Sequence, residues 1–279
     1  MSMPYSWPTC RQQAWNHVPE DCLTIELDGI TFHGAHQLDG GYYGVTSWSG
    51  WHDGSDARGG PTPYPASDGA YRTRVTMQAM PIVIEGTIEA SSRRELWEMT
   101  EALRKVLVRQ RYAPLVVTEE ALDLPSRQVS VCRLRHPRIT WDSWTSAAFT
   151  LEMQPDDWRK VDVTTQAATI RNGGTATLTN AGDEDADLSA ILTGPMSNPA
   201  LSWAGGAWSY AGTIPAGSTR QVNFVSRLVR DPATSNSYRH IVNGQWPSVP
   251  ADGQLSVKLT CTGATSATAA TLQWRSTWS

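Results

Sequence analysis

The sequence predicts a mainly β protein of two domains with a single α-helix. Three observations lead to this prediction. The chain has 279 residues, which suits about two domains, and 40% of them are hydrophobic, which is enough for a buried core. Apolar residues alternate in several short segments of the first half, whereas only one segment shows helical spacing. In the second half, strand-like segments alternate with turn sequences roughly every 8–15 residues, which is typical of a β-sandwich or barrel.

The first predicted element is a β-hairpin at residues 25–32. Asp28 and Gly29 separate two short alternating runs there, and Asp-Gly between such runs is the strongest short-range hairpin signal. The segment Gly34–Gly69 is crowded with Gly, Pro, Ser and Asp, so we expect a long loop that is functional or becomes ordered on assembly. Even spacing of apolar residues then predicts strands at Tyr71–Met77 and Pro81–Ala90.

The single helix is predicted at Ser92–Gln110. Ser92 and Glu95 have the spacing of a capping box, in which the Ser92 hydroxyl accepts the amide of residue 95 and Glu95 reaches back. One apolar stripe follows at helical spacing, made of Leu96, Met99, Leu103, Val106 and Leu107. Further strands are expected at Pro114–Thr118, Gln128–Arg135, Arg138–Asp142 and Ala147–Met153.

The sequence pattern changes near residue 158, and beyond it apolar residues show no helical spacing. We therefore expect one domain at 1–163 and a second at 164–279. Strands of the second domain are predicted at Ala168–Arg171, Thr175–Thr179, Leu188–Leu192, Leu201–Trp203, Gln221–Val225, Tyr238–Val242, Gln254–Cys261 and Thr271–Arg275. Turns are predicted at Asn172–Gly174, Pro215–Gly217, Asn243-Gly244 and Pro250–Gly253.

Composition excludes several classes of function. With 23 basic and 27 acidic side chains the formal net charge is −4, which argues against a protein whose main partner is nucleic-acid phosphate. No apolar run is long enough to cross a bilayer, and residues 1–10 lack the pattern of a Sec signal, so we expect no membrane insertion and synthesis in the cytoplasm. The four cysteines are far apart and are expected to be free thiols.

A search for catalytic or metal-binding patterns gives little. His33, His36 and His52 are interpreted as loop histidines, and the acidic run at 183–187 as a solvated turn, because it lacks the glycine and distal glutamate of an EF-hand. Asp156 and Asp157 are adjacent, so on an extended segment they point in opposite directions rather than across a cleft. The sequence has no nucleophile elbow, P-loop or dinucleotide-binding glycine motif. We expect no enzymatic activity, no cofactor and no metal.

Tryptophan is the most informative residue type, since 13 Trp accompany only three Phe. Two interpretations stay open. Indoles fill cores and subunit interfaces, where they bury much area and still satisfy one N–H group. Indoles on a β-sandwich can also stack on sugars, and the candidates for a sugar-binding platform are Trp203, Trp208 and Trp246.

The order of the segments resembles that of the distal tail protein (Dit) family, the minor tail proteins of long-tailed, non-contractile bacteriophages. In the first half the resemblance lies in Leu27–Ile30, the glycine-rich loop, the run Pro81–Ile88 and the helix and strand after it. The joint Gln154–Arg159 is similar to the Asp-Pro-x-x-aromatic connector of the family, with Asp and Pro exchanged. In the second half the similar segments are Asn172–Ala176, Gly194–Pro199, Val242–Gly244, Ala251–Gly253 with the preceding proline, Leu272–Arg275 and Trp278.

The resemblance implies a split β-barrel of the tail-tube type followed by a galectin-like sandwich. It also implies a structural role at the distal end of the phage tail, within the virion. Six barrel domains would form a ring that continues the tail tube, joins the tube protein and the tape measure protein to the tail-tip hub or tail-associated protein, and anchors receptor-binding components. DNA would pass through the lumen without specific binding.

Ring closure requires each subunit to contact the next through two different patches. We expect Tyr42, Tyr43, Trp48 and Trp51 in the long segment to be buried anchors at such subunit or partner contacts. The alternative function is a carbohydrate-binding module on the tail that contributes to host adsorption, and a glycan-cleaving tail enzyme is a third hypothesis.

Overall fold

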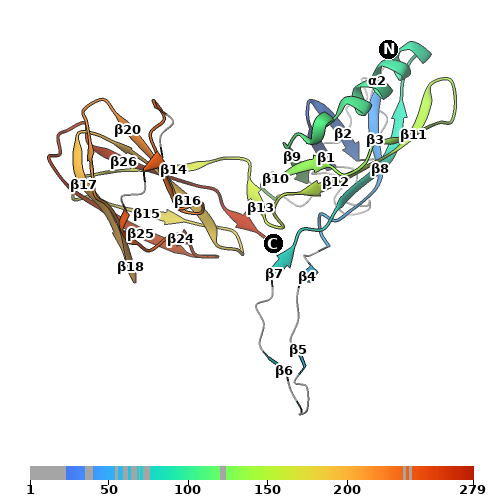
Figure 1. Cartoon of the computed structure of the whole chain (residues 1–279). Helices are drawn as coiled ribbons and strands as arrows, with labels where there is room; N and C mark the ends of the chain where they lie inside the picture. The colour runs from blue at the N-terminus through green and yellow to red at the C-terminus, as the bar shows by residue number, and fades with distance from the viewer. Residues whose placement is uncertain are drawn as a thin grey trace, which may run out of the picture. The chain divides into compact units, whose positions relative to one another are not determined.

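The structure is a computed structural model of the whole chain (Figure 1). It describes residues 23–34, 40–53, 56–58, 62–63, 68, 70–71, 76–119, 124–234, 237–238 and 241–279. The contacts divide the chain into two compact units, the first made of residues 1–160 with Ser279 and the second of residues 161–278. The sequence-based domain limits, 1–163 and 164–279, stay a prediction. The fold is mainly β and combines a closed seven-stranded barrel with further β-sheets, as the sequence predicts.

The barrel unit is built around seven strands that close on themselves. Their order is β12-β8-β3-β2-β1-β9-β10, and β10 returns to β12. The pairings are antiparallel except for β2 with β3, which is parallel. The strands are β1 (Leu23–Leu27), β2 (Ile30–Gly34), β3 (Tyr42–Ser49), β8 (Ile82–Glu89), β9 (Ala113–Glu119), β10 (Arg127–Arg133) and β12 (Ser146–Pro155).

The predicted hairpin at the start of the barrel is confirmed. Leu27 pairs with Ile30, so Asp28 and Gly29 form a two-residue turn. Both have positive φ, 49° and 85°. A turn of this kind follows the right-handed twist of the two strands, which explains why Asp-Gly marks it. Along β1 buried and accessible side chains alternate, as period-two patterning requires.

The predicted helix is confirmed, but it ends earlier than expected. Helix α2 (Arg93–Lys105) is followed by a separate short helix, η2 (Val108–Gln110). Leu107 between them has φ 51°, which no α-helix accommodates. The amide of Leu107 donates instead to the Asp28 carboxylate at 3.0 Å, so the hairpin turn of β1–β2 caps the end of the helix region. The backbone carbonyls of Arg104 and Val106, at the carboxyl-terminal end of the helix, accept hydrogen bonds from the Arg133 side chain.

The capping box at the start of α2 also differs in one contact. The Ser92 hydroxyl accepts the Glu95 amide at 3.2 Å, as predicted. The Glu95 carboxylate accepts from the amide of Ser91 at 2.7 Å and from the Ser91 hydroxyl, one residue earlier than a standard box. These bonds, led by the Ser91 hydroxyl, hold the pKa of Glu95 below its ordinary value.

The expectation of a long loop over Gly34–Gly69 is wrong for residues 42–49. Tyr42–Ser49 is β3, an interior strand of the barrel that lies between β2 and β8. Its Gly, Ser and Thr content obscures the strand pattern, and the backbone hydrogen bonds to two neighbours stabilise it instead. Residues 35–39, 54–55, 59–61, 64–67 and 69 lie outside the described residues.

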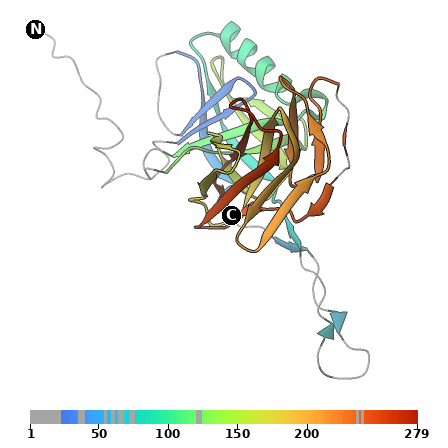
Figure 2. The ribbon, with the colours of Figure 1, turned by 90° about the vertical axis from the view of Figure 1, so that its left-hand side faces the viewer.

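Between β3 and β8 the described residues form two short antiparallel strand pairs. Asp56 pairs with Gln78, and Thr62 with Tyr71, so the two pairs are nearly in one register. In both views (Figures 1 and 2) these pairs follow one another along a single extension. The strands are β4 (Asp56–Arg58), β5 (Thr62–Pro63), β6 (Ala70–Tyr71) and β7 (Thr76–Gln78). Both ends of the strand predicted at Tyr71–Met77 are thus in strands, and its residues 72–75 lie outside the described residues. One further strand, β11 (Arg138–Trp141), pairs with β12 outside the closed barrel.

The second unit consists of two β-sheets around one apolar core. One sheet contains β14 (Gln166–Arg171), β26 (Ala269–Trp274), β16 (Ala186–Thr193), β20 (Thr219–Asn223), β21 (Leu228–Arg230), β22 (Ser237–Tyr238) and β24 (Ser248–Val249). The other contains β15 (Thr175–Thr179), β25 (Gln254–Thr262), β17 (Met196–Trp203), β18 (Gly206–Tyr210), β23 (Ile241–Gly244) and β19 (Thr213–Ile214). Asn243-Gly244 was expected to form a turn, but it lies in β23, where Asn243 pairs with Ser209.

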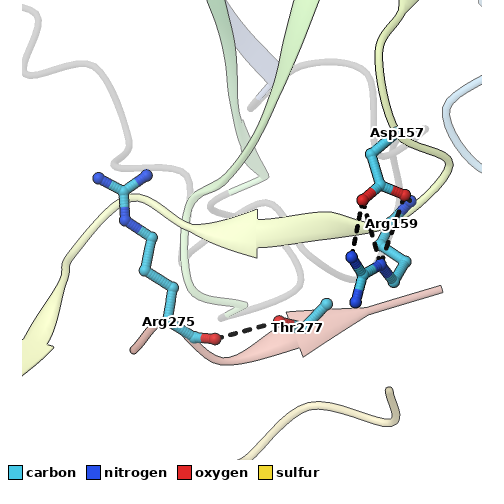
Figure 3. A network of polar contacts seen from close by, with 4 residues as sticks. All are labelled: Asp157, Arg159, Arg275 and Thr277. Carbon is cyan, nitrogen blue, oxygen red and sulfur yellow. Dashed lines mark hydrogen bonds and ion pairs between the residues drawn. The ribbon is translucent and has the colours of Figure 1, made fainter. Parts of the chain in front are cut away.

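The connecting segments carry local polar contacts that fix their course. At the end of the barrel unit, Asp157 forms an ion pair with Arg159 at 2.8 Å and accepts its amide at 3.1 Å (Figure 3). At the end of the sandwich unit, the Thr277 hydroxyl donates to the Arg275 carbonyl at 3.1 Å (Figure 3). Two short strands complete the fold, β13 (Lys160–Asp162) and β27 (Thr277–Trp278). No helix in the described parts of the chain is long and apolar enough to cross a bilayer.

Candidate interaction surfaces

The four aromatic residues predicted at subunit contacts lie on or just after β3. Tyr43 turns toward the barrel core, with its ring 5.5 Å from that of Phe32 and 6.4 Å from that of Phe149. Its hydroxyl donates to the Met99 carbonyl of α2 at 2.9 Å. Burial raises the pKa of Tyr43 to about 12. Tyr43 therefore joins the helix to the barrel within one chain, and both Tyr43 and its neighbour Tyr42 keep part of their surface accessible.

Trp48 and Trp51 form a stacked pair at the end of β3. Their ring centres are 5.9 Å apart and their planes differ by 26°. Trp51 is only 3% exposed and has the Lys160 ammonium 5.7 Å from its ring, so little of its surface is left for a partner. Trp48 is partly accessible and meets the His52 imidazole edge-on at 5.2 Å. Of the predicted anchors, Tyr42, Tyr43 and Trp48 keep accessible surface and Trp51 is buried; the role of all four in contacts between subunits stays a prediction.

The three tryptophans proposed to bind sugar differ in accessibility. Trp208 is fully buried in the sandwich core, where its ring meets Phe224 edge-on at 5.7 Å. This burial removes Trp208 from the sugar-stacking candidates, because no ring face reaches solvent. Trp203 and Trp246 are partly exposed. The Trp246 ring lies 5.8 Å from the Arg227 guanidinium and 6.2 Å from Phe224.

The polar residues considered for chemistry have structural contacts instead. His52 pairs with the Glu119 carboxylate at 3.0 Å. The interpretation of His33 as a loop histidine is wrong, because His33 lies in β2, and His36 is outside the described residues. In the acidic run, Asp185 accepts the Ala251 amide and the Ser248 hydroxyl, each at 3.1 Å. Within the described ranges, no three His, Cys, Asp or Glu side chains gather in a way that could hold a metal ion.

The cysteines that the structure describes are free thiols. Cys132 and Cys261 lie in different units, and both are partly accessible. Burial raises the pKa of the Cys261 thiol, so it is less reactive than an exposed cysteine. Cys10 and Cys22 lie outside the described residues, so the expectation of four free thiols stays a prediction for those two.

Among the described residues, the two most exposed indoles are not among the predicted site residues. Trp144 is 71% exposed and Trp97 is 56% exposed. Trp144 follows β11, and the Arg93 guanidinium lies 4.3 Å from its ring centre and 5.4 Å from that of Trp141. Trp97 lies one helical turn after Arg93 and directly after Leu96 of the apolar stripe. A large apolar ring beside the buried stripe of an amphipathic helix is the sequence signal that could have identified this surface.

Comparison with known proteins gives a likeness in structure but not in sequence. The sequence matches no established protein family and no curated protein. The crystal structure of SPP1 Dit (gp 19.1), described as a paradigm of the hub adsorption apparatus in phages that infect Gram-positive bacteria, superposes with a TM-score of 0.64 and 12% identity. The superposition covers 91% of this chain and 98% of SPP1 Dit. This chain has the SPP1 Dit fold. The family resemblance predicted from the order of segments is thereby confirmed at the level of the fold.

Two further structures of lower similarity come from phage p2 baseplates in the activated conformation, one with Ca and one with Sr. Their TM-scores are 0.47 and 0.45, each at 8% identity, and each superposition covers 85% of this chain and 97% of the other.

Proposed function

We propose that this chain is a structural protein of the phage tail tip, at the distal end of the tail in the virion. The observation that carries the proposal is the superposition on SPP1 Dit, which extends over both units and nearly the whole of that protein. Because a shared fold does not by itself imply a shared function, the surfaces of this chain must also suit an assembly. The barrel unit presents exposed indoles and the strand β11 at a sheet edge, both of which are typical of surfaces that bind other chains.

In this proposal six barrel units form a ring that connects the tail tube to the tail-tip hub. Its partners are other copies of the chain, the tube protein, the tape measure protein and the hub or tail-associated protein. The sandwich units anchor receptor-binding components. The chain has no catalytic role, and DNA passes through the ring without specific binding, in keeping with the net charge of −4.

The experiment that tests this function is electron microscopy of particles in which the chain carries a small label. The expected result is a label at the distal end of the tail, and six-fold symmetry in averaged views along the tail axis. A label confined to the head or to the tube shaft would contradict the proposal. The purified chain alone is a weaker test, because ring closure can depend on the tube partner.

A second candidate function, carbohydrate binding, is favoured by the partial exposure of Trp203 and Trp246. Sugar binding by the intact chain that is lost in Trp203→Ala and Trp246→Ala would support it. In that case Trp97→Ala, which changes an exposed indole of the other unit, serves as the matched control.

A further inference from the structure

At the start of α2, Arg93 lies beside the exposed Trp144 and the partly buried Trp141, and the exposed Trp97 follows Arg93 by one helical turn; these four residues are here called the indole patch. The Arg93 guanidinium lies over the rings of Trp141 and Trp144. Exposed tryptophan next to arginine is the composition of binding hot spots rather than of ordinary surface. Within the described residues Arg93 forms no ion pair, so its charge is available to a partner.

A second surface of the same unit is hollowed and carries a net negative charge, from Glu26 and Asp28 against Arg111. It lies over β1, β2 and β9, where Ile30, Thr31, Tyr112, Pro114 and Val116 complete most of its lining; it is here called the β1–β9 hollow. Glu26 is exposed and is flanked on the neighbouring strands by Thr31 and Val116. In the described part of the chain Glu26 has no cationic partner, since Asp28 takes the nearby Arg111. Tyr112, 54% exposed, borders the hollow.

The indole patch and the β1–β9 hollow lie on different sides of the barrel unit. The patch is at the start of α2 and next to β11, which pairs with β12. The hollow is beyond the end of the same helix, where Leu107 meets Asp28. A helix of 13 residues is about 20 Å long. In the strand order of the barrel, β1 is separated from β12 by three strands in one direction and two in the other.

We infer that the indole patch of one copy of this chain packs into the β1–β9 hollow of the next copy, with Arg93 facing Glu26. The hollow offers the side chains of Ile30, Pro114 and Val116 to the rings of the patch and the Glu26 carboxylate to the Arg93 guanidinium. A closed ring requires two different patches on each subunit, whereas a two-fold dimer uses a single patch twice. The inference rests on the proposed function and adds the contact by which the ring closes.

Photochemical cross-linking tests the contact in assembled particles. The full chain is produced with p-benzoylphenylalanine in place of Trp144, and normal and 15N-labelled copies are mixed so that cross-links between copies can be identified by mass. The expected product joins position 144 of one copy to residues of β1, β2 or β9 of another. Cross-links from position 144 to α2 or β11 of another copy would show a two-fold contact and overturn the inference, as would cross-links to other proteins alone. The same label at Val225, an exposed residue of the sandwich unit, is the matched control.

A charge exchange tests the pairing of Arg93 with Glu26. We expect Arg93→Glu and Glu26→Arg each to lower incorporation of the chain into particles about 10-fold or more, as for a hot-spot residue, and the double variant to restore most of it. Arg94→Glu is the matched control, because Arg94 is the adjacent cation and pairs with Glu98 on the same helix. If the single variants fold with unchanged thermal stability and the double variant is no better than either, Arg93 and Glu26 do not meet.

The proposed contact and the proposed function can be refuted separately. Six-fold rings that contain the chain, with cross-links from position 144 leading elsewhere, would refute this contact and leave the proposed function intact. Particles in which the chain is not part of any ring would refute the proposed function itself.

Discussion

At the scale of single residues, Tyr43 shows how one side chain joins three parts of the barrel unit. Its ring packs between Phe32 of β2 and Phe149 of β12, and its hydroxyl reaches the Met99 carbonyl of α2. The sequence predicts that Tyr43 is a buried anchor, but it does not show which groups Tyr43 contacts. Tyr43 is an anchor within the chain because the unpredicted strand β3 places it against the core.

The first prediction concerns the Tyr43 hydroxyl. Tyr43→Phe removes one hydrogen bond and should lower the free energy of unfolding by about 1 kcal/mol at neutral pH. The folded state raises the pKa of Tyr43 to about 12, whereas an unfolded tyrosine ionises near pH 10. The contribution of neutral Tyr43 to the free energy of unfolding is thus fully present below about pH 10, and it is lost as the pH rises toward 12. Urea unfolding of both proteins should show the difference shrinking over that range, and a constant difference would contradict the assignment.

A second prediction compares two glycines that are required for different reasons. An alanine at Gly86 would place its Cβ against the Gly44 carbonyl and 2.8 Å from the Phe149 ring, so Gly86→Ala should cost about 3 kcal/mol or more of unfolding free energy. Gly29 has no neighbour within 4 Å of such a Cβ but has φ 85°, so Gly29→Ala should cost only about 1 kcal/mol. Chemical denaturation measures both losses of unfolding free energy. Equal losses would contradict the prediction, because they would show that the neighbours of Gly86 move to make room for the Cβ.

At the scale of elements, local rules predict well where the signal is local. The Asp28-Gly29 turn and the start of α2 are each fixed by a few adjacent residues, and both are found where the sequence places them. The end of α2 was mispredicted, because the apolar stripe continues to Leu107 while the carboxylate of Asp28, distant in sequence, stabilises a non-helical Leu107. Strand β3 was missed because its pairing with β2 and β8 is a long-range property.

The third prediction concerns the start of the helix. Ser92→Ala removes the hydroxyl that accepts the Glu95 amide, and it should lower the unfolding free energy by about 1 kcal/mol. Arg94→Ala is the control: its side chain is 87% exposed and its ion pair with Glu98 is a surface pair, so a change below about 0.5 kcal/mol is expected. If both substitutions had the same effect in thermal unfolding, the cap would not be a specific source of stability.

At the scale of the whole molecule, the order of the segments carried more information than any one residue. It indicated a barrel followed by a sandwich, and the superposition on SPP1 Dit agrees over 91% of the chain. The prediction of the site residues was less accurate, because the sequence does not show which indoles are buried in the core. Trp208 and Trp51 are buried, whereas Trp97 and Trp144 are exposed.

The fourth prediction concerns the division of the chain. Each unit has its own buried cluster of apolar side chains, so each should fold independently. A fragment of residues 161–279 should unfold cooperatively and keep the near-ultraviolet circular dichroism of its buried Trp208. A fragment without a cooperative transition would show that the two units depend on each other for stability.

The central claim is that the chain is a ring-forming part of the tail tip, and cryo-electron microscopy of intact particles tests it most directly. The account predicts six copies of the barrel unit around the tail axis at the distal end of the tube. Density at that position that the barrel unit does not fit, or a chain found as isolated single copies in the particle, would contradict it.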